Sequence, residues 1–345
     1  MAEKITIADV ARKASCSLST VSRAFSEQHI NISTKKRIMD IANDLGYSPN
    51  RLAQGLASGL SNSYSIIIPD NQNPFYTALA ESLQNKLESF GWDSWIVFCQ
   101  NNPTHLQTQM RRLLDHHVRG IIIFPSNLCD QAPYLYRKIM EEKNPTVPIV
   151  LVSERFMTHN RYVVNGDNFT GSKLAIQHLA SLGHRRIALV TGSMNNSSLR
   201  ERYDGYRAAL EEYGLQIDES LMLLNAFSRI NSNEIKQFCS KLTMSDRPTA
   251  VFVCSDFRAL PIMRHIRNAG LRIPEDISVM GFDNIWLVEQ LGEQLTTVEF
   301  PVQEIVSDVV KILTDWTNSN GQIEDRDIRI KPRLIVRGST SESTL

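Results

Sequence analysis

The sequence has no net charge, no long apolar run and no recognisable cysteine pattern. Its 345 residues hold 37 basic and 37 acidic side chains. No stretch approaches the roughly 18 apolar residues that a membrane-spanning helix needs, and the N-terminus has no apolar core of the kind that a signal peptide carries. We therefore expect a cytoplasmic protein without a membrane partner. The five cysteines are scattered without metal-ligand or redox spacing, which favours buried free thiols.

The patterns that mark common catalytic and cofactor sites are also missing. No Walker-type glycine loop or GxGxxG pattern follows an expected strand. The serine-rich segment 195–198 contains no nucleophile elbow, and the histidines at 116, 117, 178 and 184 lack metal-ligand spacing. Because no base, nucleophile and oxyanion site can be assembled, we expect no catalytic residues, no metal and no cofactor, and so not an enzyme.

Composition and charge distribution indicate a folded protein with a basic head. Hydrophobic residues make up 42% and charged residues 21% of the chain, as in ordinary globular proteins, and the length suits two or three domains. Residues 1–62 hold eight basic and five acidic side chains, a net charge of +3, and the remainder carries −3. A small basic module on a slightly acidic body is consistent with a nucleic-acid partner.

Residues 4–48 show the signals of three short helices. Apolar residues recur at spacings of three and four. Thr6 with Asp9 is expected to cap the first helix, and Ser17 is expected to cap a second helix at residues 18–25. The third helix should begin after Ser33 and run to Leu45, with Gly46 as its stop. Two helices joined by a short turn form a helix-turn-helix, although a merely structural bundle is the alternative.

Residues 49–62 differ in character from the head. Pro49 ends the helical head that precedes it, and Gly55 and Gly59 weaken any helix that follows. A helix of this length is not stable alone in water. We expect a linker that becomes helical only when something holds it, with a plain flexible linker as the alternative.

From Tyr64 onward, short apolar runs alternate with amphipathic stretches, which predicts parallel sheets with helical crossovers. The apolar runs are 65–69, 95–99, 120–124, 149–152, 187–190, 250–254 and 277–281, and the main helical stretches are 75–90, 106–116, 171–182 and 201–213. About 280 residues of this kind suit two α/β subdomains with a cleft between them. Ligands of such sheets bind beyond the carboxyl ends of the strands, here at 70–76, 153–156, 192–202, 255–256 and 283–286.

The chain resembles the lactose-repressor/galactose-repressor (LacI/GalR) family along its whole length. The resemblance is carried by TIADVARKA, STVSRAF and LGYSPNRLAQGLASG in the head, and by GDNFTGSKLAIQHLASLGHRRIALVTG, RERYDGYRAALEEYGL and GLRIPEDISVMGFDN in the body. It implies a multi-domain protein with an all-α helix-turn-helix head and an α/β periplasmic-binding-protein-like core of two doubly wound parallel-sheet subdomains.

The resemblance also implies a function. We expect a sequence-specific DNA-binding transcriptional regulator, usually a repressor, whose operator affinity depends on a small-molecule effector, a sugar or sugar derivative. Its partners would be a pseudo-palindromic double-stranded operator and a second copy of the chain, in the bacterial cytoplasm at the nucleoid. The alternatives are a cytosolic solute-binding sensor without operator function and a sugar-acting enzyme.

The family pattern divides the chain into domains. The expected parts are a DNA-binding head at 1–48, a hinge helix or linker at 49–62, and an effector domain at 63–345, with an N-subdomain at about 63–162 and 293–328 and a C-subdomain at about 163–292 and 329–345. The chain is expected to cross between subdomains near 161–164, 291–295 and 328–330. The polar tail GSTSESTL lacks the heptads of a tetramer-forming coiled coil, which predicts a dimer.

Positions that match the family's DNA-contacting residues lie in the head and linker. The resemblance implies Leu18, Ser19 and Arg23 as base readers, Thr20, Ser22, Lys36, Tyr47 and Asn50 as phosphate contacts, and Ala53 and Leu56 as minor-groove residues of the hinge. Arginine can bind guanine with two hydrogen bonds, and leucine offers an apolar face to a thymine methyl. Lys36 departs from the threonine that is common in the family, and Gly55 departs from a better helix former.

Positions that match the family's effector contacts lie after the predicted strands. They are Phe75, Tyr76, Ser198, Arg200, Arg202, Phe227, Ser255 and Asp283. Guanidinium and carboxylate groups that face an aromatic platform suit a sugar. Ser255 and Ser153 depart from the asparagine and the acidic residue that many members carry. For Asp256 and Asn168 we expect strand-end capping rather than ligand contact.

Overall fold

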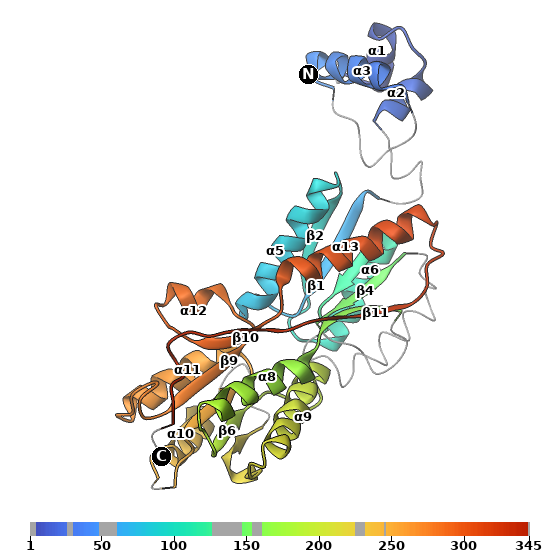
Figure 1. Ribbon diagram of the computed structural model, residues 1–345. Helices are drawn as coiled ribbons and strands as arrows, with labels where there is room; N and C mark the ends of the chain where they lie inside the picture. The colour runs from blue at the N-terminus through green and yellow to red at the C-terminus, as the bar shows by residue number, and fades with distance from the viewer. Residues whose placement is uncertain are drawn as a thin grey trace. The chain divides into compact units, whose positions relative to one another are not determined.

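The computed structural model of the protein describes residues 5–25, 30–47, 61–125, 147–153, 161–224, 232–244 and 246–343 (Figure 1). The chain divides into two compact units, Met1–Asn62 and Ser63–Leu345, and each contains its own hydrophobic core. Four residues with expected roles, Asn50, Ala53, Leu56 and Phe227, lie outside the described residues.

The described part of the first unit consists of helices α1 (Ile7–Lys13), α2 (Leu18–Ala24) and α3 (Ile32–Leu45). Each helix contributes fully buried side chains to one small core, among them Val10, Val21 and Ile38. The helix-turn-helix expected from the apolar spacing is thus confirmed.

The ends of these helices follow from local hydrogen bonds. The Thr6 backbone N–H donates to Asp9 Oδ2 at 2.9 Å, and the Thr20 N–H donates to Ser17 Oγ at 3.1 Å, as the capping signals predicted. The third helix begins earlier than expected, because Asn31 Oδ1 accepts from the Ser33 N–H at 2.9 Å. Asparagine therefore caps α3 at Ile32, and Ser33 is a donor to that cap.

The second unit contains a first sheet with the strand order β11-β5-β4-β3-β1-β2 and parallel pairing throughout, as far as the chain is described. Its strands are β1 (Ser63–Ile68), β2 (Asp93–Phe98), β3 (Gly120–Ile123), β4 (Ile149–Val152), β5 (Tyr162–Gly166) and β11 (Arg326–Ile330). Side chains from α5 (Pro74–Ser89) and α13 (Val302–Asn318) share a core with Ile66, while those from α6 (Pro103–Asp115) share another with Ile67. Burial on both faces explains the continuous apolar runs.

The second sheet has the order β7-β6-β8-β9-β10-β12 in the described residues. Its strands are β6 (Ile187–Val190), β7 (Met222–Leu223), β8 (Ala250–Val253), β9 (Ser278–Phe282), β10 (Thr296–Glu299) and β12 (Arg333–Ile335). The helices of this half are α8 (Asn168–Ser181), α9 (Ser197–Glu212), α10 (Ser232–Lys241), α11 (Asp256–Asn268) and α12 (Trp286–Gln290), with a 3-10 turn at Glu219–Leu221. The predicted doubly wound arrangement is confirmed, except that β12 pairs antiparallel to β10.

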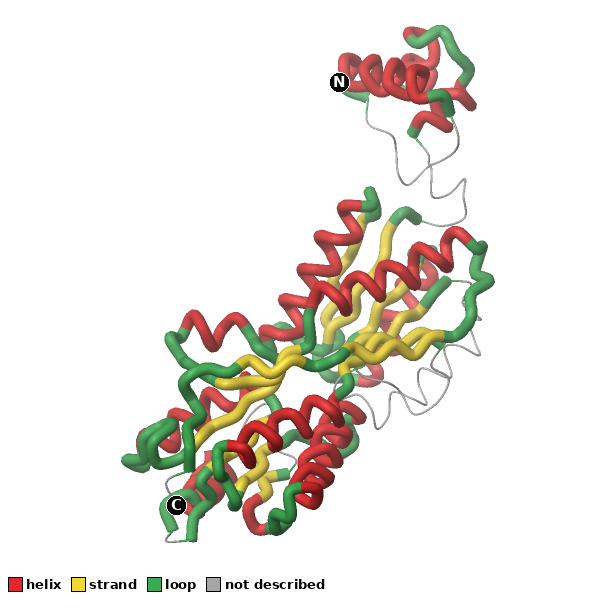
Figure 2. Tube along the Cα trace, in the orientation of Figure 1, coloured by secondary structure: helices red, strands yellow, loops and turns green. Residues whose placement is uncertain are grey.

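The chain passes from one sheet to the other after Gly166, after Glu299 and after Ile330, where the two sheets approach each other in Figure 2. The third change agrees with the crossing expected near 328–330, whereas the first two come later than those expected near 161–164 and 291–295. The reason is strand pairing: β5 and β11 are paired along their full lengths, from Tyr162 with Arg326 to Gly166 with Ile330. Similarly, β10 pairs with β9 of the second sheet before the chain returns.

Close contact between α8 and α9 depends on Gly205. A Cβ atom at this position would lie 2.3 Å from the Phe169 carbonyl oxygen, and a backbone atom of α8 cannot yield without moving the helix. We expect Gly205→Ala to lower the free energy of unfolding by about 1–3 kcal/mol, measured by urea denaturation. Glu211→Ala, at an exposed position of α9, is the control, and equal stability of the two variants would contradict this packing role.

Candidate functional site

Helix α2 presents one polar face to solvent and one apolar face to the core. Leu18 has 53% of its surface exposed, although leucine is usually buried, and Ser19, Ser22 and Arg23 are also exposed. Leu18 and Ser22 are four residues apart, as are Ser19 and Arg23, so the two adjacent pairs share one side of the helix. An exposed leucine and guanidinium on one short helix can present an apolar and a hydrogen-bonding contact to the edges of bases.

Hydroxyl groups fix the start of this helix. Ser17 Oγ lies 2.8 Å from Ser19 Oγ and 2.8 Å from Thr20 Oγ1. The cap therefore orients two of the side chains that the sequence assigned to DNA contact. A helix N-terminus with its orphan N–H groups is also a favourable place for a phosphate.

Two further expected phosphate contacts lie elsewhere in the head. Lys36 is exposed on α3, between the exposed Lys35 and Arg37, and this run supplies positive charge to the surface of the helix. Tyr47 is half-buried, and its ring packs edge-on against Phe25 with 5.6 Å between ring centroids. The ring of Tyr47 therefore packs against the head's core, and its hydroxyl group is the part that can contact a phosphate.

The second unit contains a cleft at the carboxyl ends of strands from both sheets. The space between its walls is about 840 Å³ when the part open to solvent is included. Aromatic, amide, hydroxyl and charged side chains line it together: Asp70, Gln72, Asn73, Phe75, Tyr76, Ser153, Asn165, Gly166, Asn168, Asn196, Ser198, Leu199, Arg202, Ser255, Phe257, Arg258, Asp283, Phe300 and Ile305.

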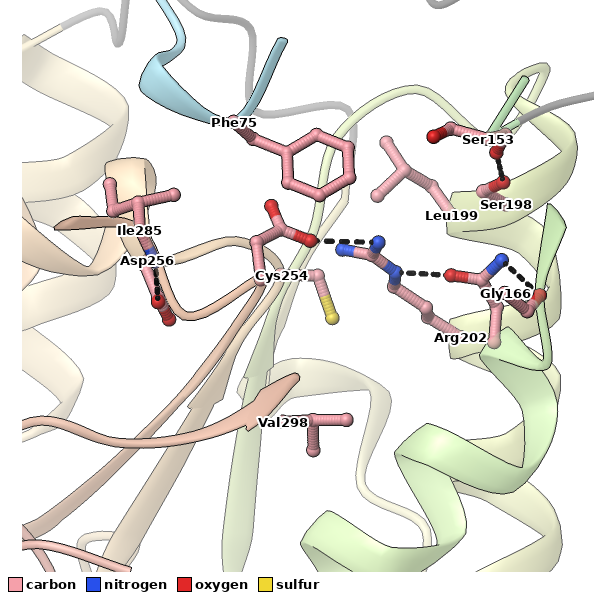
Figure 3. A network of polar contacts seen from close by, with 12 residues as sticks. Phe75, Ser153, Gly166, Ser198, Leu199, Arg202, Cys254, Asp256, Ile285 and Val298 are labelled. Carbon is pink, nitrogen blue, oxygen red and sulfur yellow. Dashed lines mark hydrogen bonds and ion pairs between the residues drawn. The ribbon is translucent and has the colours of Figure 1, made fainter. Parts of the chain in front are cut away.

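Arg202 is the centre of a buried polar network in this cleft (Figure 3). Its Nη2 donates to Asp283 Oδ1 at 3.0 Å, and its Nε donates to Asn168 Oδ1 at 2.8 Å. The guanidinium carbon lies 3.7 Å from the centre of the Phe282 ring. Arg202 and Asp283 are only 8% and 7% exposed, so a carboxylate, an amide and a ring hold this arginine in one orientation.

The positions of these three polar groups follow from the ends of their elements. Asn168 opens α8, and its Nδ2 donates to the Gly166 carbonyl at 3.0 Å. Asp283 directly follows β9, with a φ angle of +106°, which turns the chain sharply at the strand end. Burial raises the pKa of Asp283, and the neighbouring positive charge of Arg202 opposes that rise.

Asp256 is a second buried carboxyl, but its contacts are structural. It is fully buried at the start of α11, where its Oδ2 accepts from the Ile285 N–H at 3.1 Å and its Oδ1 accepts from Thr297 Oγ1 at 2.7 Å. It ties α11 to β10 and to the loop after β9, in line with the capping role expected from the sequence. Burial raises the pKa of Asp256 to about 8, and the nearby Asp283 adds to this effect.

The raised pKa of Asp256 predicts that the core loses stability as the pH rises. The folded state keeps a proton that the unfolded chain releases near pH 4, so the free energy of unfolding should fall between about pH 4 and about pH 8. We expect Asp256→Asn to flatten this dependence, measured by urea denaturation across that interval. Glu211→Gln serves as the control, and an unchanged slope in Asp256→Asn would refute the assignment.

Most of the expected effector residues meet in this cleft. Phe75 and Tyr76 line it from α5, and Ser198 and Ser255 line it beside the arginine network. Ser198 Oγ donates to the Ser153 carbonyl, which connects α9 to the end of β4. Phe227 lies outside the described residues.

Arg200 differs from its expected role. Its side chain is exposed, its Nε donates to the Met194 carbonyl at 3.0 Å, and it does not line the cleft. The helical period explains this, because a residue two positions before Arg202 points to a different side of α9. We therefore correct the expectation of effector contact at this position.

The sequence also left several cleft residues unassigned. Arg258 and Phe257 lie in the first turn of α11, and Asn165 and Phe300 lie at the points where the chain changes sheet. Arg258 and Phe257 directly follow a strand end that the sequence had marked, and that proximity was the available signal. Across the described residues, no helix combines the length and apolarity needed to cross a bilayer, and no group of three or more acidic, histidine or cysteine side chains is arranged to hold a metal ion.

Comparison with known proteins decides the family. The model for bacterial regulatory proteins of the lacI family matches residues 6–50, and the model for a periplasmic binding protein-like domain matches residues 176–340. The HTH-type transcriptional regulator DegA of Bacillus subtilis (strain 168) is 32% identical over 340 residues, which cover 98% of each chain. The chain belongs to the lacI family. This lacI-family protein is a DNA-binding transcriptional regulator and not an enzyme.

Solved structures agree with this fold. The Lac repressor dimer bound to operator and the anti-inducer ONPF is 23% identical, with a TM-score of 0.78 over 98% of this chain and 100% of that chain. A LacI family transcriptional regulator from Enterococcus faecium with bound ribose is 26% identical, with a TM-score of 0.68 over 81% and 99%. The expected fold class is confirmed, and the match to the head disfavours a sensor module without operator function.

Proposed function

We propose that this lacI-family regulator is a homodimeric repressor whose affinity for a pseudo-palindromic operator is controlled by a sugar or sugar derivative bound in the cleft. The observation that carries the proposal is the buried Arg202–Asp283 pair, which lies in a cleft that aromatic and amide side chains also line. Hydroxyl groups of a sugar both donate and accept, so they suit carboxylate acceptors and guanidinium or amide donors placed together. The regulator of E. faecium that binds ribose supports the same ligand class.

The effector contacts in this proposal come from both halves of the core. Phe75 and Tyr76 would cover the apolar face of the ligand from the first sheet, and Arg202 and Asp283 would bind its hydroxyl groups from the second. Because the two sheets are separate and the chain only crosses from one to the other, a ligand that contacts both halves can change their relative placement. We propose an N-subdomain and a C-subdomain that respond to the ligand in this way.

The DNA contacts in this proposal divide into readers and positioners. Leu18, Ser19 and Arg23 would read base edges from the exposed side of α2. Phosphate contacts, which position without specifying, would come from Thr20, Ser22, Lys36, Tyr47 and Asn50. The hinge would place Ala53 and Leu56 in the minor groove, with the two leucines of a dimer as wedges.

Ligand and operator binding are then linked through the hinge. A change in the placement of the two N-subdomains of a dimer moves the starts of the two linkers, and a short helix forms only where packing or DNA supports it. Such coupling is reciprocal and typically amounts to about 1–3 kcal/mol. The proposed site of action is the nucleoid in the bacterial cytoplasm, where operator DNA lies.

The test of DNA function begins with selection of target sequences from random duplexes by the full chain. Fluorescence anisotropy at about 150 mM salt then compares the selected site with a scrambled duplex, since non-specific binding is strongly salt-dependent. We expect a preference of at least about 1,000-fold. Equal affinity for both duplexes would refute the proposal.

The dimer is tested separately by size exclusion with light scattering. The chain should elute with twice its 39.1 kDa mass, because a pseudo-palindromic site requires two heads related by a two-fold axis. A stable tetramer or a monomer at the concentrations that occupy DNA would contradict this part of the proposal.

A further inference from the structure

A second arginine lies in the effector cleft, at the start of α11. Arg258 Nη1 donates to the Cys254 carbonyl at 3.2 Å, and its backbone N–H donates to the Ser255 carbonyl at 2.9 Å. These bonds hold both the helix turn and the side chain at the end of β8. These hydrogen bonds therefore hold Arg258 in place where it lines the cleft.

The backbone opposite Arg258 leaves room for its guanidinium. A Cβ atom on Gly192 would lie 2.7 Å from Leu199 Cδ1 and 2.8 Å from Arg258 Nη2, so a side chain at position 192 would displace the ends of both side chains. Gly192 follows β6, and Arg258 follows the adjacent strand β8. Glycine at one strand end thus accommodates the cation that follows the next.

The charges around Arg258 belong to the same cleft. Burial lowers the pKa of Arg258, Tyr76 and Asp283 oppose that shift, and the positive charge of Arg202 adds to it. Asp283 is the carboxylate that faces both guanidinium groups. Asp256, next to them, is mostly protonated at neutral pH because its pKa is about 8. Among the described residues of this wall, Arg202 and Arg258 are thus permanent cations on either side of one carboxylate, Asp283.

Asp70, the acidic residue that the described part of the opposite wall contributes, is held by its own loop. Asp70 Oδ1 accepts from the Gln72 N–H at 2.8 Å, and its Oδ2 accepts from Asn101 Nδ2 at 2.5 Å. Asp70 follows β1 of the first sheet, whereas both arginines come from helices of the second. Its carboxylate therefore stabilises the loop after β1 through both of its oxygens.

We propose that the effector carries an anionic group, a carboxylate or a phosphate, and that Arg258 binds this group while Arg202 and Asp283 hold the hydroxylated part of the ligand. This inference rests on the proposed function of the cleft. Guanidinium groups match the geometry of carboxylate and phosphate oxygens. The ligand class is thus a sugar acid or a sugar phosphate rather than a neutral sugar.

The first experiment uses inorganic phosphate as the probe and thermal unfolding of the full chain as the readout. At equal ionic strength, phosphate should raise the melting temperature above that in chloride by roughly 2 °C or more. Arg258→Met should abolish the difference, Arg258→Lys should keep part of it, and Arg200→Met, the same change at an exposed arginine outside the cleft, should keep all of it. No phosphate effect, or an equal effect in all four proteins, would overturn the proposal.

The second experiment separates sugar acids from sugar phosphates. Calorimetric titration compares glucose, glucuronate and glucose 6-phosphate, and likewise ribose and ribose 5-phosphate, on the wild-type chain and on Arg258→Met. An anionic member should bind at least about tenfold more tightly than its neutral counterpart, and the variant should lose that advantage. A neutral sugar that binds both proteins as tightly as its anionic forms, and shifts operator affinity, would overturn this inference and leave the proposed function standing. Loss of operator preference in the wild type would instead overturn the proposed function.

Discussion

Arg202→Met is expected to lower the free energy of unfolding of the effector domain by about 3–5 kcal/mol, because it breaks a buried ion pair on one side only. Asp283, which is 7% exposed, would lose the guanidinium that donates to it, and Asn168 Oδ1 would lose its donor. The same variant should lose its response to the effector, since the side chain lies in the cleft. Urea denaturation measures the first effect, and operator titration with and without effector measures the second.

The control for this prediction is an exposed pair of the same chemistry. Arg267 donates to Glu293 through two nitrogens at 2.5 and 2.7 Å, with its side chain 45% exposed. Arg267→Met should cost about 0–1 kcal/mol, because solvent screens the pair.

A double variant tests the cause of the loss. Arg202→Met combined with Asp283→Asn removes both charges, and asparagine tolerates the positive φ angle of +106° at that position. The double variant should be more stable than Arg202→Met alone. If it is less stable, an uncompensated buried carboxylate is not the origin of the loss.

Arg23→Ala is expected to weaken operator binding by about 2–6 kcal/mol in a dimer, or about 1–3 kcal/mol for each half-site, and to relax the choice of base at the position it reads. Arg23 is exposed on the side of α2 that also carries Leu18 and Ser19. Its loss removes hydrogen bonds to base edges and leaves the core residues Val21 and Ala24 unchanged. Anisotropy titrations on the selected site and on single-base variants of it measure both effects.

Lys36→Ala is the companion variant that distinguishes a phosphate contact from a base-reading contact. Its exposed charge on α3 should contribute to all duplexes equally, so specific and scrambled DNA should weaken together and the salt dependence should become less steep by about one ion for each subunit. If Arg23→Ala and Lys36→Ala have the same profile across sequences, the division into readers and positioners is wrong.

Sequence patterns predicted the elements that periodicity or capping marks strongly. The runs 149–152 and 187–190 are β4 and β6 without any shift, because strands buried on both faces are uninterrupted apolar segments. β11 was harder to recognise, since its residues RDIRI are charged and alternate between half-buried and exposed at the edge of the sheet. β10 is rich in threonine and is recognisable mainly through its partner β9.

The candidate site was predictable only where family motifs or strand ends marked it. Arg202 and Asp283 matched such motifs, and the structure brings them within 3.0 Å of each other. The contacts of Arg258 could not be predicted, because they depend on the space over Gly192 and on the pairing of two strands that are far apart in the sequence. Arg200 was also assigned from the family resemblance, and the turn of the helix directs its exposed side chain elsewhere.

The order in which the strands occur has a consequence during protein synthesis. β11 and β12, at Arg326–Ile330 and Arg333–Ile335, are edge strands of different sheets, and the segment after them hydrogen-bonds to β9 through Ser339 Oγ and the Val279 carbonyl at 2.6 Å. The first sheet can therefore be completed only after residue 330 has been synthesised, and the second only after residue 335. The three-helix head, in contrast, is complete after about residue 45 and can fold early. A premature stop codon just before Arg326 would remove one strand from each sheet. Such truncated chains would keep a head able to meet DNA and lose the means of responding to a metabolite, so late nonsense mutations should be as damaging to regulation as early ones.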